Sequence, residues 1–176
     1  MPTITFIIGR AGSGKGTLCK RYISEHRNCR WIESGGLIRT RLASDVALQT
    51  LINDGNLVPD ETIARLVADE ITSAETDVLL DGFPRTANQL LLLKSKLHGY
   101  KMKAVLVDVD ESACFHRLLN RQDNRNDDYP EAIRRRFEIY DRNIRDIREL
   151  VELTVIDGDA DQETVYHRFE NAILAA

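Results

Sequence analysis

The residues with the clearest chemical potential form the stretch GRAGSGKGT, Gly9 to Thr17, directly after the apolar run TITFII. Its glycines let successive backbone N–H groups turn inward around an anion, and a helix that begins near Lys15 would add its positive end. Lys15 could reach terminal phosphates and Thr17 could lie near Mg²⁺, although Gly16 separates the two and departs from the general phosphate-loop pattern. An ordinary glycine-rich turn is the alternative, and the lysine and hydroxyl at this spacing favour phosphate binding over it.

A second group of polar residues follows the apolar run VLLDGF. The segment LLDGFPRTANQ contains Asp81, Arg85 and Gln89. Asp81 is suited to support Mg²⁺ or its waters, and Arg85 offers a planar fork for a second phosphate. A helix cap and a surface ion pair are the respective alternatives. Because ligands of open α/β sheets bind at the carboxyl ends of strands, we expect this pair to face the same site as the glycine-rich loop.

Further arginines occur in the segments ESGGLIR and NRQDNRNDDYPEAIRRRF. Arg39 follows a predicted strand and could approach the same anion, although the segment alone supports a surface position equally well. On a helix, Arg136 shares one stripe with apolar side chains and therefore needs an anion, whereas Arg134 and Arg135 point to the surface. Arg121 and Arg125 flank a short polar step, which is typical of a loop that closes over a phosphate.

The elements that must position these residues alternate in type. Apolar, β-branched runs recur as TITFII, RWIES, VLLDGF, KAVLVDVD and LTVID, with segments of helical period between them. Near-continuous apolar runs predict an α/β fold, in which a parallel sheet is covered by helices on both faces. We expect helices over residues 16–26, 45–54, 60–74, 86–97, 111–120, 130–151 and 161–175. A chain of 176 residues with 43% hydrophobic content predicts a single domain.

Composition excludes several other classes of function. The 24 Lys and Arg against 28 Asp and Glu give a formal charge of −4, so the chain lacks the bulk positive field of a nucleic-acid binder. Cys19, Cys29 and Cys114 are scattered, which favours reduced thiols in a cytoplasmic protein. No apolar run approaches the ~18 residues of a membrane span, and the early strand leaves no room for a leader. We expect a monomer that binds small molecules and neither nucleic acid nor membrane.

Taken together, these segments resemble the adenylate kinase and UMP/CMP kinase family of nucleoside monophosphate kinases. GSGKGT is similar to the family's form of the phosphate loop, DGFPRTANQ to its most specific signature, and RNDDYPEAIRRRF to its R-x-D-D segment and the helix that follows. The resemblance covers nearly the whole chain in order. It implies a P-loop NTPase fold with a five-stranded parallel sheet, a small helical insertion for the acceptor at about residues 34–63, and a very short lid at about residues 121–128.

The resemblance also implies a reaction, in which ATP with Mg²⁺ phosphorylates a nucleoside monophosphate to give two diphosphates. The implied residues for ATP are Gly12, Ser13, Gly14, Lys15, Gly16, Thr17 and Arg121. The implied residues for the acceptor are Ser34, Arg39, Asn56, Leu57, Val58, Gly82, Phe83, Pro84, Arg85, Gln89, Arg125 and Arg136. The implied catalytic residues are Lys15, Arg85, Arg125 and Arg136, and Mg²⁺ falls to Thr17 and Asp81, partly through water. Such transfer needs positioning and charge neutralisation without a nucleophile from the protein.

Three positions bear on how far the resemblance extends. Only three residues separate Arg121 from Arg125, so the lid is short and has no zinc-binding cysteines. Gly36 stands where the family usually has an aspartate that orders the waters of Mg²⁺, which would leave Asp81 to support the metal alone. Gln89 favours AMP as the acceptor, because pyrimidine-specific members more often have Asn there. A UMP/CMP kinase and a catalytically weakened regulatory module, the latter favoured only by Gly36, are the alternatives.

Overall fold

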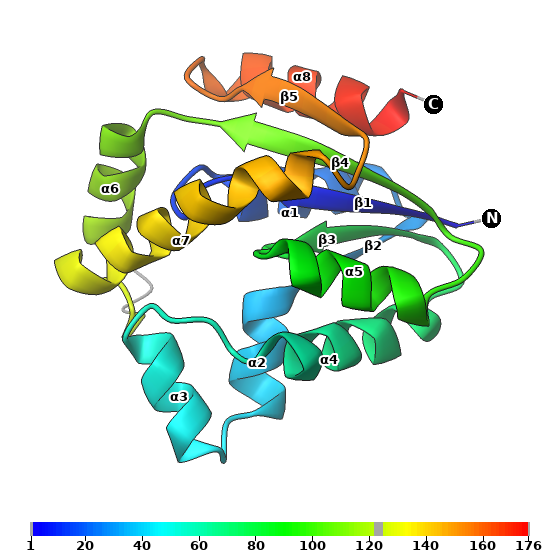
Figure 1. Ribbon diagram of the computed structural model, residues 1–176. Helices are drawn as coiled ribbons and strands as arrows, with labels where there is room; N and C mark the ends of the chain where they lie inside the picture. Colours follow the sequence, from blue (N-terminus) through cyan, green and yellow to red (C-terminus); the bar gives the residue numbers. More distant parts are fainter. Residues whose placement is uncertain (1, 122–124, 176) are drawn as a thin grey trace.

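Five parallel strands form a single sheet in the computed structural model, which describes residues 2–121 and 125–175 (Figure 1). The order across the sheet is β2-β3-β1-β4-β5. The strands are β1 (Thr3–Ile8), β2 (Cys29–Glu33), β3 (Asp77–Asp81), β4 (Lys101–Asp108) and β5 (Leu153–Asp157). The parallel α/β sheet and its five strands are confirmed. The central strand β1 runs directly into the glycine-rich loop, so the loop starts from the most buried part of the molecule.

Seven helices lie where the sequence predicts them, with ends that differ by no more than three residues. They are α1 (Lys15–Glu25), α3 (Val46–Asn53), α4 (Asp60–Thr72), α5 (Ala87–Lys96), α6 (Glu111–Leu119), α7 (Pro130–Arg148) and α8 (Gln162–Leu174). The apolar pattern did not predict helix α2 (Ser34–Arg41), which falls within the helical insertion that the resemblance implies at about residues 34–63. Two glycines in its first turn lower its helix propensity, and only Ser34 among its residues is buried, so it lacks the apolar stripe by which helices are recognised.

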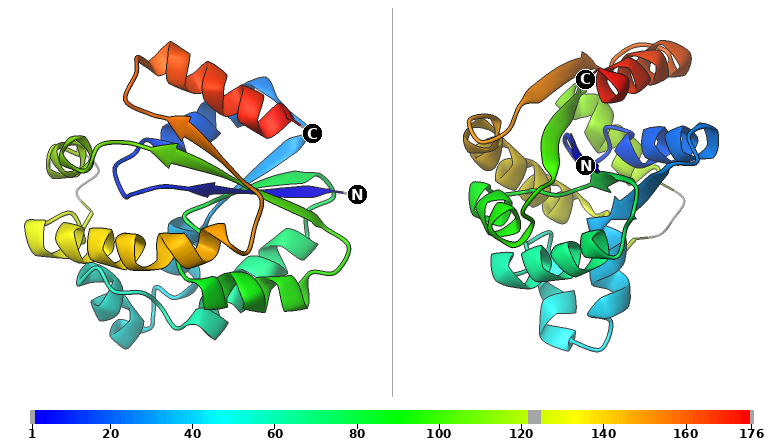
Figure 2. Two further views of the ribbon diagram at one scale, coloured as in Figure 1. Left: turned by 45° about the horizontal axis from the view of Figure 1, so that its top comes forward. Right: turned by 90° about the vertical axis from the view of Figure 1, so that its right-hand side faces the viewer.

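The helices cover both faces of the sheet. Helices α1 and α8 lie on one face and α4, α5 and α7 on the other, while α2 and α3 form an extension beside the start of α4 (Figures 1 and 2). Two apolar clusters fill the spaces between the layers. Phe6 and Leu80 belong to the cluster under α4 and α5, and Ile7 and Leu79 to the one under α1 and α8. Neighbouring residues of one strand therefore serve opposite faces, as the period of two requires.

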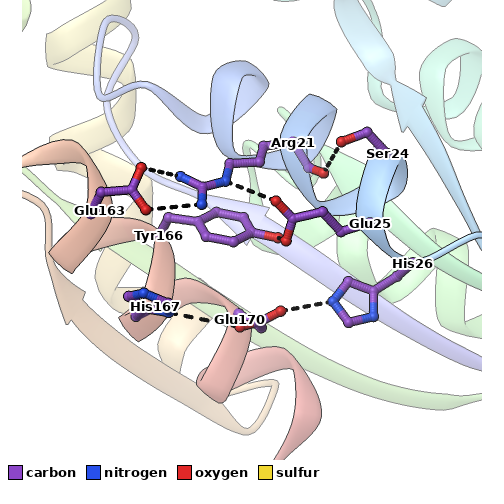
Figure 3. A network of polar contacts seen from close by, with 8 residues as sticks. All are labelled: Arg21, Ser24, Glu25, His26, Glu163, Tyr166, His167 and Glu170. Atoms are coloured by element: carbon purple, nitrogen blue, oxygen red, sulfur yellow. Dashed lines mark hydrogen bonds and ion pairs between the residues drawn. The ribbon is translucent and has the colours of Figure 1, made fainter.

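A network of polar contacts fixes α1 to α8 away from the loop (Figure 3). The Arg21 guanidinium donates to both carboxylate oxygens of Glu163, at 2.6 and 2.9 Å, and its carbon lies 3.8 Å from the centre of the Tyr166 ring. The Tyr166 hydroxyl donates to Glu25 at 2.7 Å, and His26 contacts Glu170 at 2.8 Å. Exposed ion pairs contribute only about 0–1 kcal/mol each, so the network mainly sets the direction of the helix that follows the phosphate loop.

Two glycines give the loop its shape for different reasons. Gly12 and Gly14 have φ angles of 85° and 88°, in the left-handed region that side chains disfavour. A Cβ atom at Gly12 would lie 2.5 Å from the carbonyl oxygen of Cys114 in α6, whereas one at Gly14 would meet nothing within 4 Å. Close packing against α6 therefore constrains Gly12, and only the backbone angle constrains Gly14.

Within the described residues, no helix is both long and apolar enough to span a membrane.

This difference predicts unequal effects of one methyl group. We expect Gly14→Ala to lower the free energy of unfolding by about 1–2 kcal/mol through backbone strain alone. We expect Gly12→Ala to lower it further, because the Cys114 carbonyl must also move. Urea unfolding of both variants without nucleotide measures the two losses. Equal losses would show that α6 does not constrain the loop.

Candidate active site

A cleft of about 440 Å³ lies at the carboxyl ends of the strands. Its walls come from the glycine-rich loop, α2, the segment before α4, the turn after β3 and the inner side of α7. Every predicted site residue lines this cleft except Ser13. Ser13 is buried within the loop, and its hydroxyl accepts a hydrogen bond from Lys15 at 3.1 Å. The fold thus brings together segments that are distant in the sequence, and residues 122–124 of the predicted lid lie outside the described residues.

The glycine-rich loop closes around the ammonium group of its own lysine. Besides Ser13, Lys15 Nζ donates to the carbonyl oxygens of Gly9 and Arg10, at 2.8 and 2.7 Å. All three of its protons are thereby used. Burial lowers the pKa of Lys15, and the nearby Asp81 carboxylate acts in the opposite direction. A phosphate in the loop would take the place of these oxygens and receive, in addition, the free N–H groups at the start of α1.

Asp81 ends β3 and is buried, with 5% of its surface exposed. Its carboxylate makes no hydrogen bond or ion pair to any residue in the ranges 2–121 and 125–175. Burial raises its pKa, and Lys15 only partly offsets the effect. Buried polar groups are almost always paired, so an unpartnered carboxylate that lines a cleft fits a bound cation. A Cβ atom at Gly16 would lie 3.6 Å from Asp81 Oδ2, which places the carboxylate beside the loop.

Asp128 contacts two arginines, Arg121 just after α6 and Arg136 within α7. Arg136, with 12% of its side chain exposed, contacts carboxylate oxygens of Asp127 and Asp128, both at 3.0 Å. Arg121 contacts the other oxygen of Asp128 at 3.3 Å. The anion expected for the inward-facing Arg136 is thus supplied by the protein itself, immediately before α7. These ion pairs hold both guanidinium groups at the cleft.

Arg85 lies in the turn after β3, and its Nε donates to the carbonyl oxygen of Gly82 at 3.0 Å. Desolvation by the surrounding protein lowers the pKa of Arg85 most, and the positive charge of Arg136 lowers it further. The residue is nevertheless exposed to the water of the cleft. The peptide bond between Phe83 and Pro84 is cis. The remaining residues predicted to bind the acceptor line the same cleft, namely Ser34, Asn56, Leu57, Val58, Gly82, Phe83 and Pro84.

Glu33 is a cleft residue that the motifs did not single out. It is the last residue of β2, and its Oε1 accepts a hydrogen bond from Arg39 at 2.9 Å and lies 3.7 Å from a nitrogen of Arg125. It pairs in register with Asp81 on the neighbouring strand. Its position directly after an apolar run was the available signal, because the same position relative to a strand identified Asp81.

The amide of Gln89 is buried and orientated by two neighbours, with only 2% of the residue exposed. Its Oε1 accepts from the backbone N–H of Arg85 at 2.8 Å, and its Nε2 donates to Asp60 at 2.9 Å. Asp60 also accepts from Asn88 at 2.8 Å. The bonds with Arg85 and Asp60 leave the Gln89 amide with one further N–H on Nε2 and one further lone pair on Oε1. Asp60, which the motif did not include, therefore fixes which end of the amide is the donor.

The cleft gathers cationic groups around a buried carboxylate. Its lining includes the loop with Lys15 and the arginines Arg39, Arg85, Arg125 and Arg136, and the charges of Lys15, Arg85 and Arg125 act on Asp81. Such a site binds two phosphorylated ligands and neutralises charge during phosphoryl transfer. Fold and site together define a P-loop phosphotransferase.

Comparison with known proteins identifies the family. The family model described as adenylate kinase matches residues 7–155. UMP-CMP kinase 3 from Arabidopsis thaliana is 36% identical over 145 residues, which cover 79% of this chain and 71% of that protein. An adenylate kinase from Rhizobium meliloti (strain 1021) is 33% identical over 187 residues, which cover 94% and 97%. One from Encephalitozoon cuniculi (strain GB-M1) is 30% identical over 175 residues, which cover 95% and 96%. The chain belongs to the adenylate kinase family and is a nucleoside monophosphate kinase, which confirms the predicted resemblance.

Gly16 offers a test that separates stability from activity. A methyl group there would lie 3.6 Å from Asp81 and 3.8 Å from Trp31, which are ordinary contact distances. The residue is in the first turn of α1, where alanine has a higher helix propensity than glycine. Gly16→Ala should therefore raise the free energy of unfolding by up to about 1 kcal/mol, and the melting temperature should stay the same or rise. The methyl group would fill the space between loop and carboxylate, so kcat/KM should fall at least about tenfold. A variant with full activity would show that this space is not used.

Removal of the Asp81 charge should stabilise the empty enzyme. Burial raises the pKa of Asp81, so the ionised form lowers the stability of the fold once the pH exceeds the unfolded value of about 3.9. In EDTA at pH 7, Asp81→Asn should therefore melt at a higher temperature than the wild type while losing most of its activity. The difference in melting temperature should vanish as the pH falls below about 4. A lower melting temperature at pH 7 would show that Lys15 more than compensates the buried charge.

Proposed function

We propose that this protein transfers the γ-phosphoryl group of ATP to AMP, giving two molecules of ADP. The observation that carries the choice of acceptor is the orientated amide of Gln89. Adenine presents an amino donor next to a ring-nitrogen acceptor, which an amide with one free donor and one free acceptor can pair. Asp60 and the Arg85 N–H group hold that amide still before the base arrives, so little side-chain entropy remains to be lost on binding.

The proposed roles of the other residues are those that the family resemblance implies, and their shared place on the cleft lining supports them. The loop and Lys15 bind the phosphates of ATP, and Arg121 stacks on its adenine. Arg39 and Arg85 bind the phosphate of AMP, while Arg125 and Arg136 neutralise the transferred group. Thr17 and the unpartnered Asp81 hold Mg²⁺, partly through water. When bound, the metal would offset the negative charge of the ATP phosphates.

The acceptor is tested by initial rates with AMP, CMP, UMP, GMP and dCMP at saturating MgATP. We expect the highest kcat/KM with AMP. Cytosine also presents an amino donor beside a ring nitrogen, so CMP is the most informative competitor. A kcat/KM for CMP or UMP that exceeds that for AMP tenfold, about 1.4 kcal/mol, would assign the protein to the UMP/CMP kinases instead. Tight ATP binding without any diphosphate production would identify a regulatory module.

Substitution of Lys15 tests whether the glycine-rich loop binds the phosphates of ATP. Lys15→Ala should lose most activity with every acceptor, whereas Lys96→Ala, which removes an exposed lysine at the end of α5, should behave as the wild type. Circular dichroism melting curves of both variants separate loss of chemistry from loss of fold, since Lys15 also bonds three oxygens of the loop. Retained activity in Lys15→Ala would exclude the loop as the phosphate site.

A further inference from the structure

Glu33 places a negative charge inside a cleft that otherwise gathers cations for phosphates. It ends β2, directly opposite Asp81 in the register of the sheet, and both residues line the cleft. Carboxylates repel phosphates, so a second one in a phosphate site needs a positive counterpart in the working complex. In the structure, that counterpart is Arg39 at 2.9 Å, with Arg125 at 3.7 Å.

The Glu33 carboxylate also occupies the space next to Gly36. A Cβ atom at Gly36 would lie 3.3 Å from Glu33 Oε2, closer than most side-chain contacts allow. The carboxylate thus lies directly against the point at which a side chain at position 36 would begin, and the glycine leaves it room. A carboxylate at either position would lie on the same side of the cleft.

We propose that Glu33 supplies the second carboxylate on the magnesium side of the cleft, in place of an acid at position 36. The inference rests on the proposed function, in which Mg²⁺ accompanies ATP. When the phosphates of both nucleotides bind Arg39 and Arg125, the Glu33 carboxylate loses its partners in the protein. The hydrated cation then provides the positive charge that Glu33 and Asp81 jointly require. Asp81 therefore does not support the metal alone.

A ratio of two dissociation constants measures this role without turnover. Glu33 should weaken the binding of metal-free ATP by repulsion and strengthen that of MgATP. Glu33→Gln should therefore lower the ratio of the Kd for ATP in EDTA to the Kd for MgATP about fivefold or more, within the range of typical coupling between ligands. Trp31, the sole tryptophan, lines the cleft 3.8 Å from a Cβ atom at Gly16, so its fluorescence can report both constants.

Two further variants make the result specific. Glu75→Gln removes an exposed carboxylate just before β3. This residue lies at the amino end of the strand, away from the cleft at the carboxyl ends, so the variant should leave the ratio unchanged. Gly36→Asp, placed in the Glu33→Gln background, should restore the ratio, because it returns a carboxylate to the same side of the cleft. Melting curves confirm that each variant is folded, and Glu33→Ser offers a second neutral side chain should the glutamine variant unfold.

The outcomes separate this inference from the function on which it rests. An unchanged ratio in Glu33→Gln would overturn the role of Glu33 while a metal-dependent wild type still supports the proposed function. A loss of AMP affinity with an unchanged ratio would assign Glu33 to holding Arg39 and Arg125 only, and would also overturn it. A wild type that binds ATP equally well with and without Mg²⁺ would overturn the proposed use of the metal itself.

Discussion

The carboxylate of Asp81 is buried at the end of β3 without a partner among the described residues, and the arrangement of the cleft follows from that charge. An uncompensated buried charge is expensive, and burial raises the pKa of Asp81 accordingly. Lys15 is the first group that offsets it, yet the lysine is itself drawn toward the oxygens of its own loop. The charges of the protein alone therefore leave Asp81 incompletely compensated, which is the condition under which a carboxylate favours an additional cation. Preorganised charge of this kind is the main means by which phosphoryl transfer is accelerated.

The cations of the cleft are held in place by acids of the protein until ligands arrive. Asp127 and Asp128 hold Arg136, Glu33 holds Arg39, and Asp60 orientates Gln89. Each acid reduces the side-chain entropy that its partner would lose on binding a phosphate or a base. The acids that hold arginines also compete with the incoming anion. This competition is weak for the partly exposed pair of Glu33 with Arg39, because ion pairs near water contribute only about 0–1 kcal/mol. It is stronger for Arg136, whose pairs with Asp127 and Asp128 are largely buried.

Sequence reasoning recovered the elements that have a period and the residues that have a motif. The five strands and seven of the helices follow from apolar patterning, and the phosphate loop and the residues near Arg85 follow from spacing at strand ends. Helix α2 escaped because its glycines and its exposed surface remove both propensity and pattern. Glu33 and Asp60 escaped for another reason. Their importance depends on which side chain lies opposite in space, and a pairing such as that of Glu33 with Arg39 becomes specific only when the chain has folded.

The two glycines that depart from common patterns, Gly16 and Gly36, acquire related explanations from the fold. Neither has a φ angle in the left-handed region, so backbone freedom does not account for them. Both face carboxylates instead: Gly16 faces Asp81 at 3.6 Å, and Gly36 faces Glu33 at 3.3 Å, measured from the added Cβ atom in each case. Because glycine has no side chain, Gly16 leaves space beside Asp81 on the side of the loop, and Gly36 leaves space beside Glu33 on the side of α2. A hydrated divalent cation needs such space, since it retains several waters when it binds. The glycines and the acids are therefore parts of one arrangement, in which absent side chains matter as much as the charged ones.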